Sequence, residues 1–145
     1  MLLIKNRRAN FDYEISEKLV AGVVLTGAEV KSVRLKMGSL TGSFVQVIDG
    51  QAVLFNAQIS PYKFASDQDY EPTRTRQLLL HKREIYRLAE AVASKHYTLV
   101  PLAFILEKNK VKLEIGVGRG RKNHEKRDKI REREAKREQT ALNFR

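Results

Sequence analysis

The stretch that decides the fold is residues 44–55, with the sequence Phe-Val-Gln-Val-Ile-Asp-Gly-Gln-Ala-Val-Leu-Phe. Two strand-like runs flank the dipeptide Asp49-Gly50, which is the kind of pair that a type I′ turn between antiparallel strands requires. The stretch therefore predicts a β-hairpin, with one strand at 44–48 and its partner at 51–55.

A second pair of strands is predicted nearer the C-terminus. From 111 to 117, valine, leucine and isoleucine alternate with lysine, glutamate and glycine, which indicates a half-buried strand with one charged, solvated edge. Its expected partner is the run 98–107, joined to it through Lys108-Asn109.

Three further segments complete the predicted pattern. Residues 20–35 are expected to be extended, with bulges or sharp bends at Gly22 and Gly27. Apolar residues within 85–92 recur at helical spacing and predict one amphipathic helix. Residues 61–77 contain a proline and little periodicity, so we expect a long loop there.

These elements favour a mainly β fold. Short strands, one covering helix and no β–α–β alternation are typical of a small closed antiparallel β-barrel related to the oligonucleotide-binding fold, with one or more short helices. A β-sandwich is the alternative.

Composition restricts the function classes. The 145 residues include 28 Lys and Arg against 17 Asp and Glu, a net charge of +11, which argues for a polyanionic partner such as nucleic acid or an anionic membrane surface. There is no cysteine, which excludes disulfides, thiol catalysis and cysteine-ligated metals. No apolar run is long enough for a signal peptide or a membrane span, so we expect a cytoplasmic protein.

The charge divides the chain into a body, 1–117, and a basic tail, 118–145. The tail holds 11 Lys and Arg against 5 Asp and Glu, and Gly118 and Gly120 predict a flexible hinge at its start. Strong helix formers follow, but their few apolar residues form no stripe. We therefore expect a tail that is disordered alone and helical once it lies along phosphates.

Two other interpretations of the tail are a solubilising extension and a membrane-surface helix. A membrane-surface helix needs a pronounced apolar face, which this segment lacks. The direct continuation of the tail from a basic strand argues against a mere solubilising extension.

The sequence contains no catalytic motif. His81, His96 and His124 lack the spacing of metal ligands, and the glycines between 116 and 120 match no phosphate-binding loop. A nuclease would need an acidic metal cluster or a histidine pair, and no motif for either is present. We expect no metal, no cofactor and no enzyme activity.

Motifs along nearly the whole chain resemble those of the small protein B (SmpB) family, bacterial proteins that bind transfer-messenger RNA. The matching stretches are Asn6-Arg7-Arg8-Ala9, Asp12-Tyr13, Leu25-Thr26-Gly27-x-Glu29-Val30-Lys31-Ser32, Ile59-Ser60-Pro61, Pro72-x-Arg74-x-Arg76-x-Leu78-Leu79-Leu80-His81-Lys82-Arg83-Glu84, Thr98-Leu99-Val100-Pro101-Leu102, Lys112-Leu113-Glu114-Ile115-Gly116, Glu125-Lys126-Arg127 and Ile130-Arg131-Glu132-Arg133-Glu134.

The resemblance implies both partners and a mechanism. Its members bind the transfer-RNA-like domain of transfer-messenger RNA and deliver it to stalled ribosomes, and their tail enters the empty messenger channel near the decoding centre and becomes helical there. We therefore expect transfer-messenger RNA and the ribosome as partners, no membrane, and a monomeric chain. A general basic RNA-binding barrel without a preferred RNA is the alternative.

The resemblance also implies the site residues. The expected contacts with transfer-messenger RNA are Tyr13, Glu29, Lys31, Leu79, His81 and Lys82. The expected ribosome contacts in the tail are Arg119, Arg121, Lys122, His124, Lys126, Arg127, Lys129, Arg131 and Arg133. Two of these have a structural alternative, since Leu79 can pack in a core and Glu29 can form a salt bridge within the body.

Four positions depart from the usual pattern of the family. Ala28 stands where tryptophan is common, Val20 where glutamate is frequent, and Glu125 where aspartate is frequent. Phe11 replaces a common histidine, so it retains a ring for stacking but cannot donate a hydrogen bond.

Overall fold

The computed structural model describes residues 1–65, 69–121 and 123–143, and in the last range it describes side chains for residues 126–137. The elements in chain order are β1 (Leu2–Lys5), α1 (Ala9–Asp12), β2 (Tyr13–Val23), α2 (Gly27–Arg34), β3 (Gly38–Ser39), β4 (Phe44–Ile48), β5 (Gln51–Phe55), β6 (Gln58–Ile59), β7 (Arg76–Leu79), α3 (Lys82–Lys95), β8 (Thr98–Glu107), β9 (Lys110–Gly120) and α4 (Asn123–Asn143).

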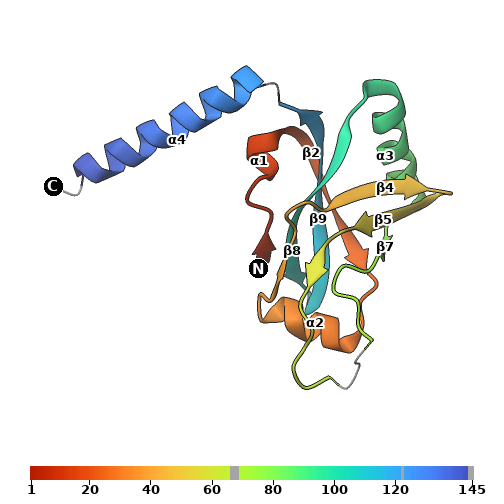
Figure 1. The fold of residues 1–145 in the computed structure, drawn as a ribbon. Coiled ribbons are helices and arrows are strands. Elements are labelled where there is room, and N and C mark those ends of the chain that lie inside the picture. Colours follow the sequence, from red (N-terminus) through yellow and green to blue (C-terminus); the bar gives the residue numbers. More distant parts are fainter. Residues whose placement is uncertain (66–68, 122, 144–145) are drawn as a thin grey trace.

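The fold is mainly β and antiparallel, as the sequence predicts. A seven-stranded sheet has the order β1-β8-β9-β2-β7-β5-β4, and β3 pairs with β6 in a separate ribbon (Figure 1). Within the described residues no ladder joins the edge strands β1 and β4, so the structure does not show the expected closed barrel. Instead, β4 packs against α3 and β8.

Both predicted hairpins are confirmed. β4 and β5 pair from Phe44↔Phe55 to Ile48↔Gln51, and φ is 50° at Asp49 and 75° at Gly50, as a type I′ turn requires. The turn between β8 and β9 has the same pair of positive φ values, 52° at Lys108 and 62° at Asn109.

The strand β9 continues through Gly120, three residues past the expected end of the body. Its last residues pair with the start of β2, from Tyr13↔Gly120 to Ile15↔Gly118. A Cβ on Gly118 would lie 2.0 Å from the carbonyl oxygen of Glu14, so glycine at this position permits the close approach of β2. The hinge predicted at these glycines is therefore part of the sheet.

The extended stretch predicted at 20–35 is wrong beyond Val23, because α2 occupies Gly27–Arg34. A capping box begins the helix. The Glu29 amide donates to Thr26 Oγ1 at 3.1 Å, and the Thr26 amide donates to Glu29 Oε1 at 2.9 Å. Gly27 is the first helical residue, so it marks no bulge.

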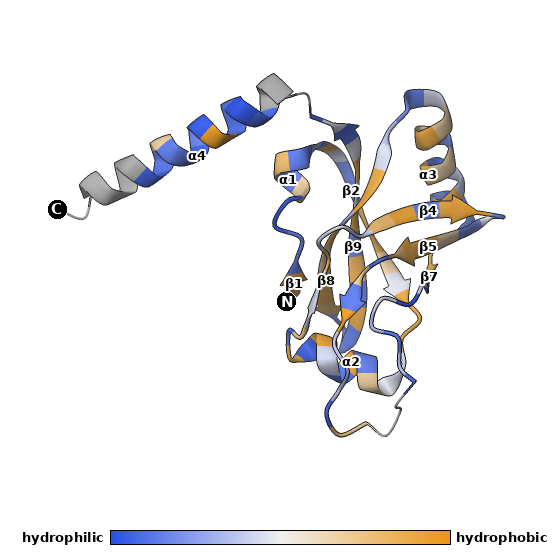
Figure 2. Ribbon diagram, viewed as in Figure 1, coloured by the Kyte–Doolittle hydropathy of each residue, from blue (hydrophilic) through white to orange (hydrophobic). Residues whose placement is uncertain are grey.

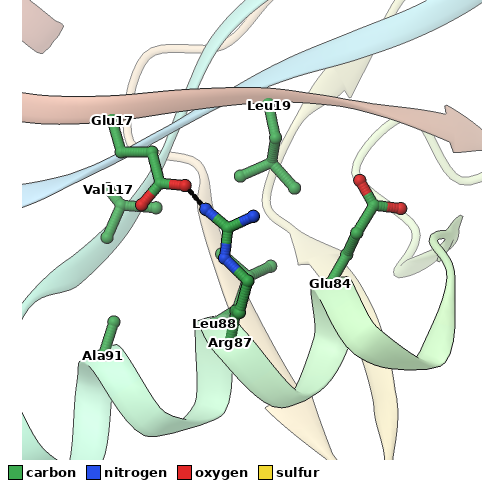
Figure 3. Close-up of a pocket in the computed structure, with 7 residues that line it drawn as sticks. All are labelled: Glu17, Leu19, Glu84, Arg87, Leu88, Ala91 and Val117. Carbon is green, nitrogen blue, oxygen red and sulfur yellow. Dashed lines mark ion pairs between the residues drawn. The ribbon is translucent and has the colours of Figure 1, made fainter.

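The predicted amphipathic helix is confirmed as α3. The loop predicted at 61–77 is wrong at its end, because β7 begins at Arg76, and residues 66–68 of that loop lie outside the described residues. Figure 3 shows the inner side of α3, where Leu88 and Ala91 face Leu19 of β2 and Val117 of β9. An ion pair between Arg87 and Glu17 ties the helix to the sheet beside them.

The core lies between the coiled sheet and helices α2 and α3. Its fully buried side chains include Leu54, Phe104 and Leu113, and Figure 2 shows hydrophobic residues along the central strands. The coloured part of α4 is mainly hydrophilic in the same view, and the helix projects from the body beyond α1. The core thus belongs to the β body alone.

Candidate nucleic-acid interface

Glu29 forms the centre of a buried ionic cluster. Its carboxylate is 1% exposed. Oε2 accepts hydrogen bonds from Arg76 Nη2 at 2.6 Å and from Arg74 Nε at 3.1 Å, and the Tyr70 hydroxyl lies 3.0 Å away. Oε1 accepts from the Thr26 amide and from Arg74 Nη2. Both oxygens are therefore engaged within the body.

This environment lowers the pKa of the carboxyl group. Burial alone would raise the pKa of Glu29, but hydrogen bonds from Arg74, Thr26 and Arg76 outweigh burial, so the pKa falls from 4.5 to about 2. Glu29 remains ionised at neutral pH. The salt bridge within the body, the structural alternative for Glu29, is what the structure contains.

The partner Arg76 lies at an inward position of β7 and is fully buried. Its Nη1 donates to the carbonyl oxygen of Ala57 at 2.6 Å, and its Nη2 donates to that of Pro72 at 3.0 Å. The cluster thus fixes the segment before β7 against α2. Arg76 was not among the predicted site residues, although its alternation with Leu78 places it on the inward side of a strand.

Lys31 lies on the exposed side of α2, on the same helix as Glu29 but outside its cluster. Its Nζ is 5.5 Å from the centroid of the Tyr62 ring, close enough for a cation–π contact. The ammonium group is accessible for a phosphate.

Leu79, His81 and Lys82 lie together where β7 ends and α3 begins. Leu79 is 55% exposed, so it does not pack in the core. The His81 amide donates to Glu84 Oε1 at 3.0 Å, which orients the start of α3, and the side chains of His81 and Lys82 are exposed.

A groove of about 290 Å³ runs beside Leu79. Gly22 and Val23 of β2 form one wall, and the turn and first residues of β9, including Lys110 and Lys112, form another. A Cβ on Gly22 would lie 3.1 Å from Leu79 Cβ, so the glycine leaves room for this side chain. The result is an apolar surface with lysines at its edge.

Tyr13 lies at the opposite end of β2. Its half-buried side chain packs against Ala9, Val100 and Leu102 and lines a cleft of about 410 Å³ beside α1. Gly22, the partner of Leu79, is nine residues further along the strand, a distance of roughly 30 Å at about 3.3 Å per residue. Tyr13 and Leu79 therefore lie near opposite ends of strand β2, whose course Figure 1 shows.

The tail residues begin on the sheet. Arg119 of β9 pairs with Glu14 at 2.5 Å, and Arg121 donates from Nε to the carbonyl oxygen of Asn10 at 3.0 Å. Lys122 and the His124 side chain lie outside the described residues.

The helix α4 presents the other predicted cations. Lys126 is 3.5 Å from Asp12 of α1, whereas Lys129 and Arg131 form ion pairs within the helix, at 3.7 Å to Glu132 and to Asp128. Arg127 and Arg133 are exposed. As the sequence predicts, no apolar stripe runs along the described part of α4.

Two further observations bear on other classes of function. Among the described residues, no three His, Cys, Asp or Glu side chains gather as a metal site would require. The helices of the described ranges include none that combines the length and apolarity of a membrane span.

An antiparallel β body that carries a lysine-edged groove and a basic helical extension is typical of the nucleic-acid-binding class. The comparison with known proteins then gives the family. The chain belongs to the SmpB family, because the family model described as SmpB protein matches residues 3–143.

Curated relatives cover nearly the same span. The SsrA-binding protein of Roseiflexus sp. (strain RS-1) is 47% identical over 134 residues, 92% of this chain and 85% of the relative. The SsrA-binding protein of Lactobacillus acidophilus is 45% identical over 137 residues, 94% of this chain and 91% of the relative.

A solved structure described as "tmRNA-SmpB: a journey to the center of the bacterial ribosome" is also similar. It matches with a TM-score of 0.70 and 43% sequence identity, and the match covers 85% of this chain and 87% of that one.

Proposed function

We propose that this protein is a non-enzymatic RNA-binding adaptor of ribosome rescue in the bacterial cytoplasm. It binds the transfer-RNA-like domain of transfer-messenger RNA, also called SsrA RNA, and delivers it to stalled ribosomes. The observation that carries the proposal is the family match from residue 3 to residue 143, which includes both body and tail. Relatives named for SsrA binding support the choice of RNA.

The end of the body around Leu79 is the best candidate for the contact with the transfer-RNA-like domain. An exposed leucine beside an exposed histidine offers apolar and stacking contacts to unpaired bases, and Lys82 offers a charge for the phosphates. Lysines at 110 and 112 edge the same groove. Folded RNA is recognised by such combinations of shape and charge.

Glu29 acts indirectly in this proposal. Its carboxylate has no oxygen free for RNA, but it holds Arg74 and Arg76 and caps the helix that carries Lys31. Loss of Glu29 would therefore disturb the body before it disturbed any single RNA contact.

The tail is the second RNA-binding part. Its cations lie on a helix without an apolar side that projects beyond α1, which suits a channel lined with ribosomal RNA phosphates (Figure 1). Without contacts outside the tail the helix is expected to be marginal, because its i, i+4 pairs contribute only about 0.2–0.5 kcal/mol each. The relation of the coiled sheet to oligonucleotide-binding barrels stays a prediction.

The test compares two folded RNAs at several salt concentrations. One is the transfer-RNA-like domain, and the other is an ordinary transfer RNA of similar size. Phosphate contacts alone would make log K fall with log salt by about 0.7–0.9 per phosphate for both RNAs alike. We expect a preference of tenfold or more, about 1.4 kcal/mol, to persist as the salt concentration rises.

A matched pair of variants locates the preference. Leu79→Ala should reduce the difference in affinity between the two RNAs. Ile48→Ala, at another exposed apolar side chain on the β4–β5 hairpin, should leave that difference unchanged. Superimposed curves for the two RNAs would instead identify a general basic RNA-binding protein.

A further inference from the structure

Cations from the residue before α1 and from the tail helix α4 gather around the short helix α1. Three positively charged groups surround the ring of Phe11. The distances to the ring centroid are 5.1 Å for Arg8 Cζ, 5.8 Å for Lys126 Nζ and 6.0 Å for Arg133 Cζ. Each lies within about 6 Å, the range in which the negative face of an aromatic ring attracts a cation.

Asp12, the next residue, binds the same segments. Its carboxylate is 3.4 Å from Arg8 Nε and 3.5 Å from Lys126 Nζ. The Asp12 and Lys126 side chains are 29% and 32% exposed, so the contact is partly shielded from water. Lys126 is thus held by a ring and a carboxylate from two adjacent residues.

The backbone before α4 is fixed at the same place. The Arg121 amide donates to the carbonyl oxygen of Asp12 at 2.8 Å, and Arg121 Nε donates to that of Asn10 at 3.0 Å. These bonds place the first turn of α4 over α1, where Lys126 and Arg133, seven residues apart, reach the same ring from one side of the helix.

We propose that Phe11 and Asp12 form an intramolecular docking site for the basic helix α4, which holds the tail in one direction until a polyanion displaces it. The occupant is the segment from Lys126 to Arg133. The segment binds through its positive charges, which contact the carboxylate of Asp12 and the ring of Phe11. Docking of this kind does not require an apolar stripe on α4. This inference does not rest on the identity of the RNA.

The docking site competes with RNA for the same groups. When a phosphate binds Lys126 or Arg133, that side chain loses its contact with Phe11 or Asp12. RNA binding to the tail should therefore weaken docking, and docking should weaken RNA binding. The ion pair with Asp12 weakens as salt is added, so docking should also weaken.

The chain contains no cysteine, so two introduced cysteines can be spin-labelled selectively. We would label the full chain at Ser94→Cys on α3 and Glu134→Cys on α4, both exposed positions, and measure the distance distribution between the labels by pulsed electron resonance. At low salt and without RNA we expect one narrow distribution.

Three variants and one control test the contacts. Phe11→Leu, which retains apolar bulk, and Asp12→Asn should each broaden the distribution at least twofold, whereas Phe11→Trp should keep it narrow because the ring remains. Phe64→Leu, at an exposed aromatic residue outside α1, should match the unsubstituted chain. A distribution that is equally broad before and after Phe11→Leu, or equally narrow, would overturn the proposal.

A single-stranded oligouridylate of twelve nucleotides tests the competition. Saturating amounts should broaden or shift the narrow distribution of the unsubstituted chain. An unchanged narrow distribution with the oligonucleotide bound would show that docking and polyanion binding do not compete, which would overturn that part of the proposal.

Discussion

Glu29 couples the stability of the body to pH. Its pKa of about 2 in the folded protein lies below its ordinary value of 4.5, so the stabilisation is complete above pH 4.5 and is lost as the pH falls toward 2. A shift of this size corresponds to about 3 kcal/mol. Glu29→Gln should remove this pH dependence and should lower the free energy of unfolding at pH 7 by about 3–5 kcal/mol, because Arg76 is left buried without its counter-charge.

Urea unfolding between pH 2 and pH 7 measures both effects. The control is Glu90→Gln on the exposed side of α3, which should retain the pH dependence of the unsubstituted chain. If the Glu29→Gln and Glu90→Gln variants lost stability equally on acidification, the cluster around Glu29 would not be the source of the pH dependence.

The residues of this cluster show why part of the site lies beyond sequence analysis. Arg74 and Arg76 are 45 and 47 residues from Glu29, and only the fold brings them together. The local signal that was present is the spacing of Thr26 and Glu29, which is a capping box and predicts a helix start. Leu79 could be singled out only through the family motif, because an exposed leucine and a core leucine look alike in sequence.

At the scale of elements, glycine controls how closely β2 and β9 approach. Gly118→Ala would place a Cβ 2.0 Å from the carbonyl oxygen of Glu14, and backbone on both sides leaves no flexible atom to move. We expect the free energy of unfolding to fall by about 1–3 kcal/mol or more, because overpacking usually costs this much. Chemical denaturation of the purified variant measures it.

Gly120→Ala is the matched control for this prediction. It lies two residues further along the same strand, and a Cβ there meets no atom within 4 Å. Its unfolding free energy should stay close to that of the unsubstituted chain. Equal losses at the two positions would mean that the close approach is not what selects glycine at 118.

Some predicted elements depend on neighbouring residues alone, whereas others depend on contacts between distant parts of the chain. The hairpins at 44–55 and 98–117 depend on alternation and a two-residue turn, which neighbouring residues determine. The strand pairing of Gly118 with Ile15 depends on a contact across more than a hundred residues, so the local pattern suggested a hinge where the sheet continues.

At the scale of the whole molecule, charge is a better guide than glycine to where the core ends. The excess of lysine and arginine after residue 117 begins close to the end of the last core strand, and Figure 2 shows the same contrast between α4 and the body. The direction of the tail could not be predicted, because Phe11 and Asp12 are more than a hundred residues away from the α4 cations that they contact.

The division of labour between body and tail can be tested by ending the chain after Arg121, which preserves all of β9 and its pairing with β2. The unfolding free energy should change by less than about 1 kcal/mol, because the described interactions that hold α4 to the body are partly exposed ion pairs and cation–ring contacts.

The truncated chain should bind the transfer-RNA-like domain nearly as well as the full chain, because the groove beside Leu79 lies at the other end of β2. It should fail in the rescue of stalled ribosomes, because it lacks the cations proposed to enter the messenger channel. A truncated chain that unfolds would show that α4 is part of the folding unit, and one that still rescues stalled ribosomes would show that the tail is not part of the mechanism.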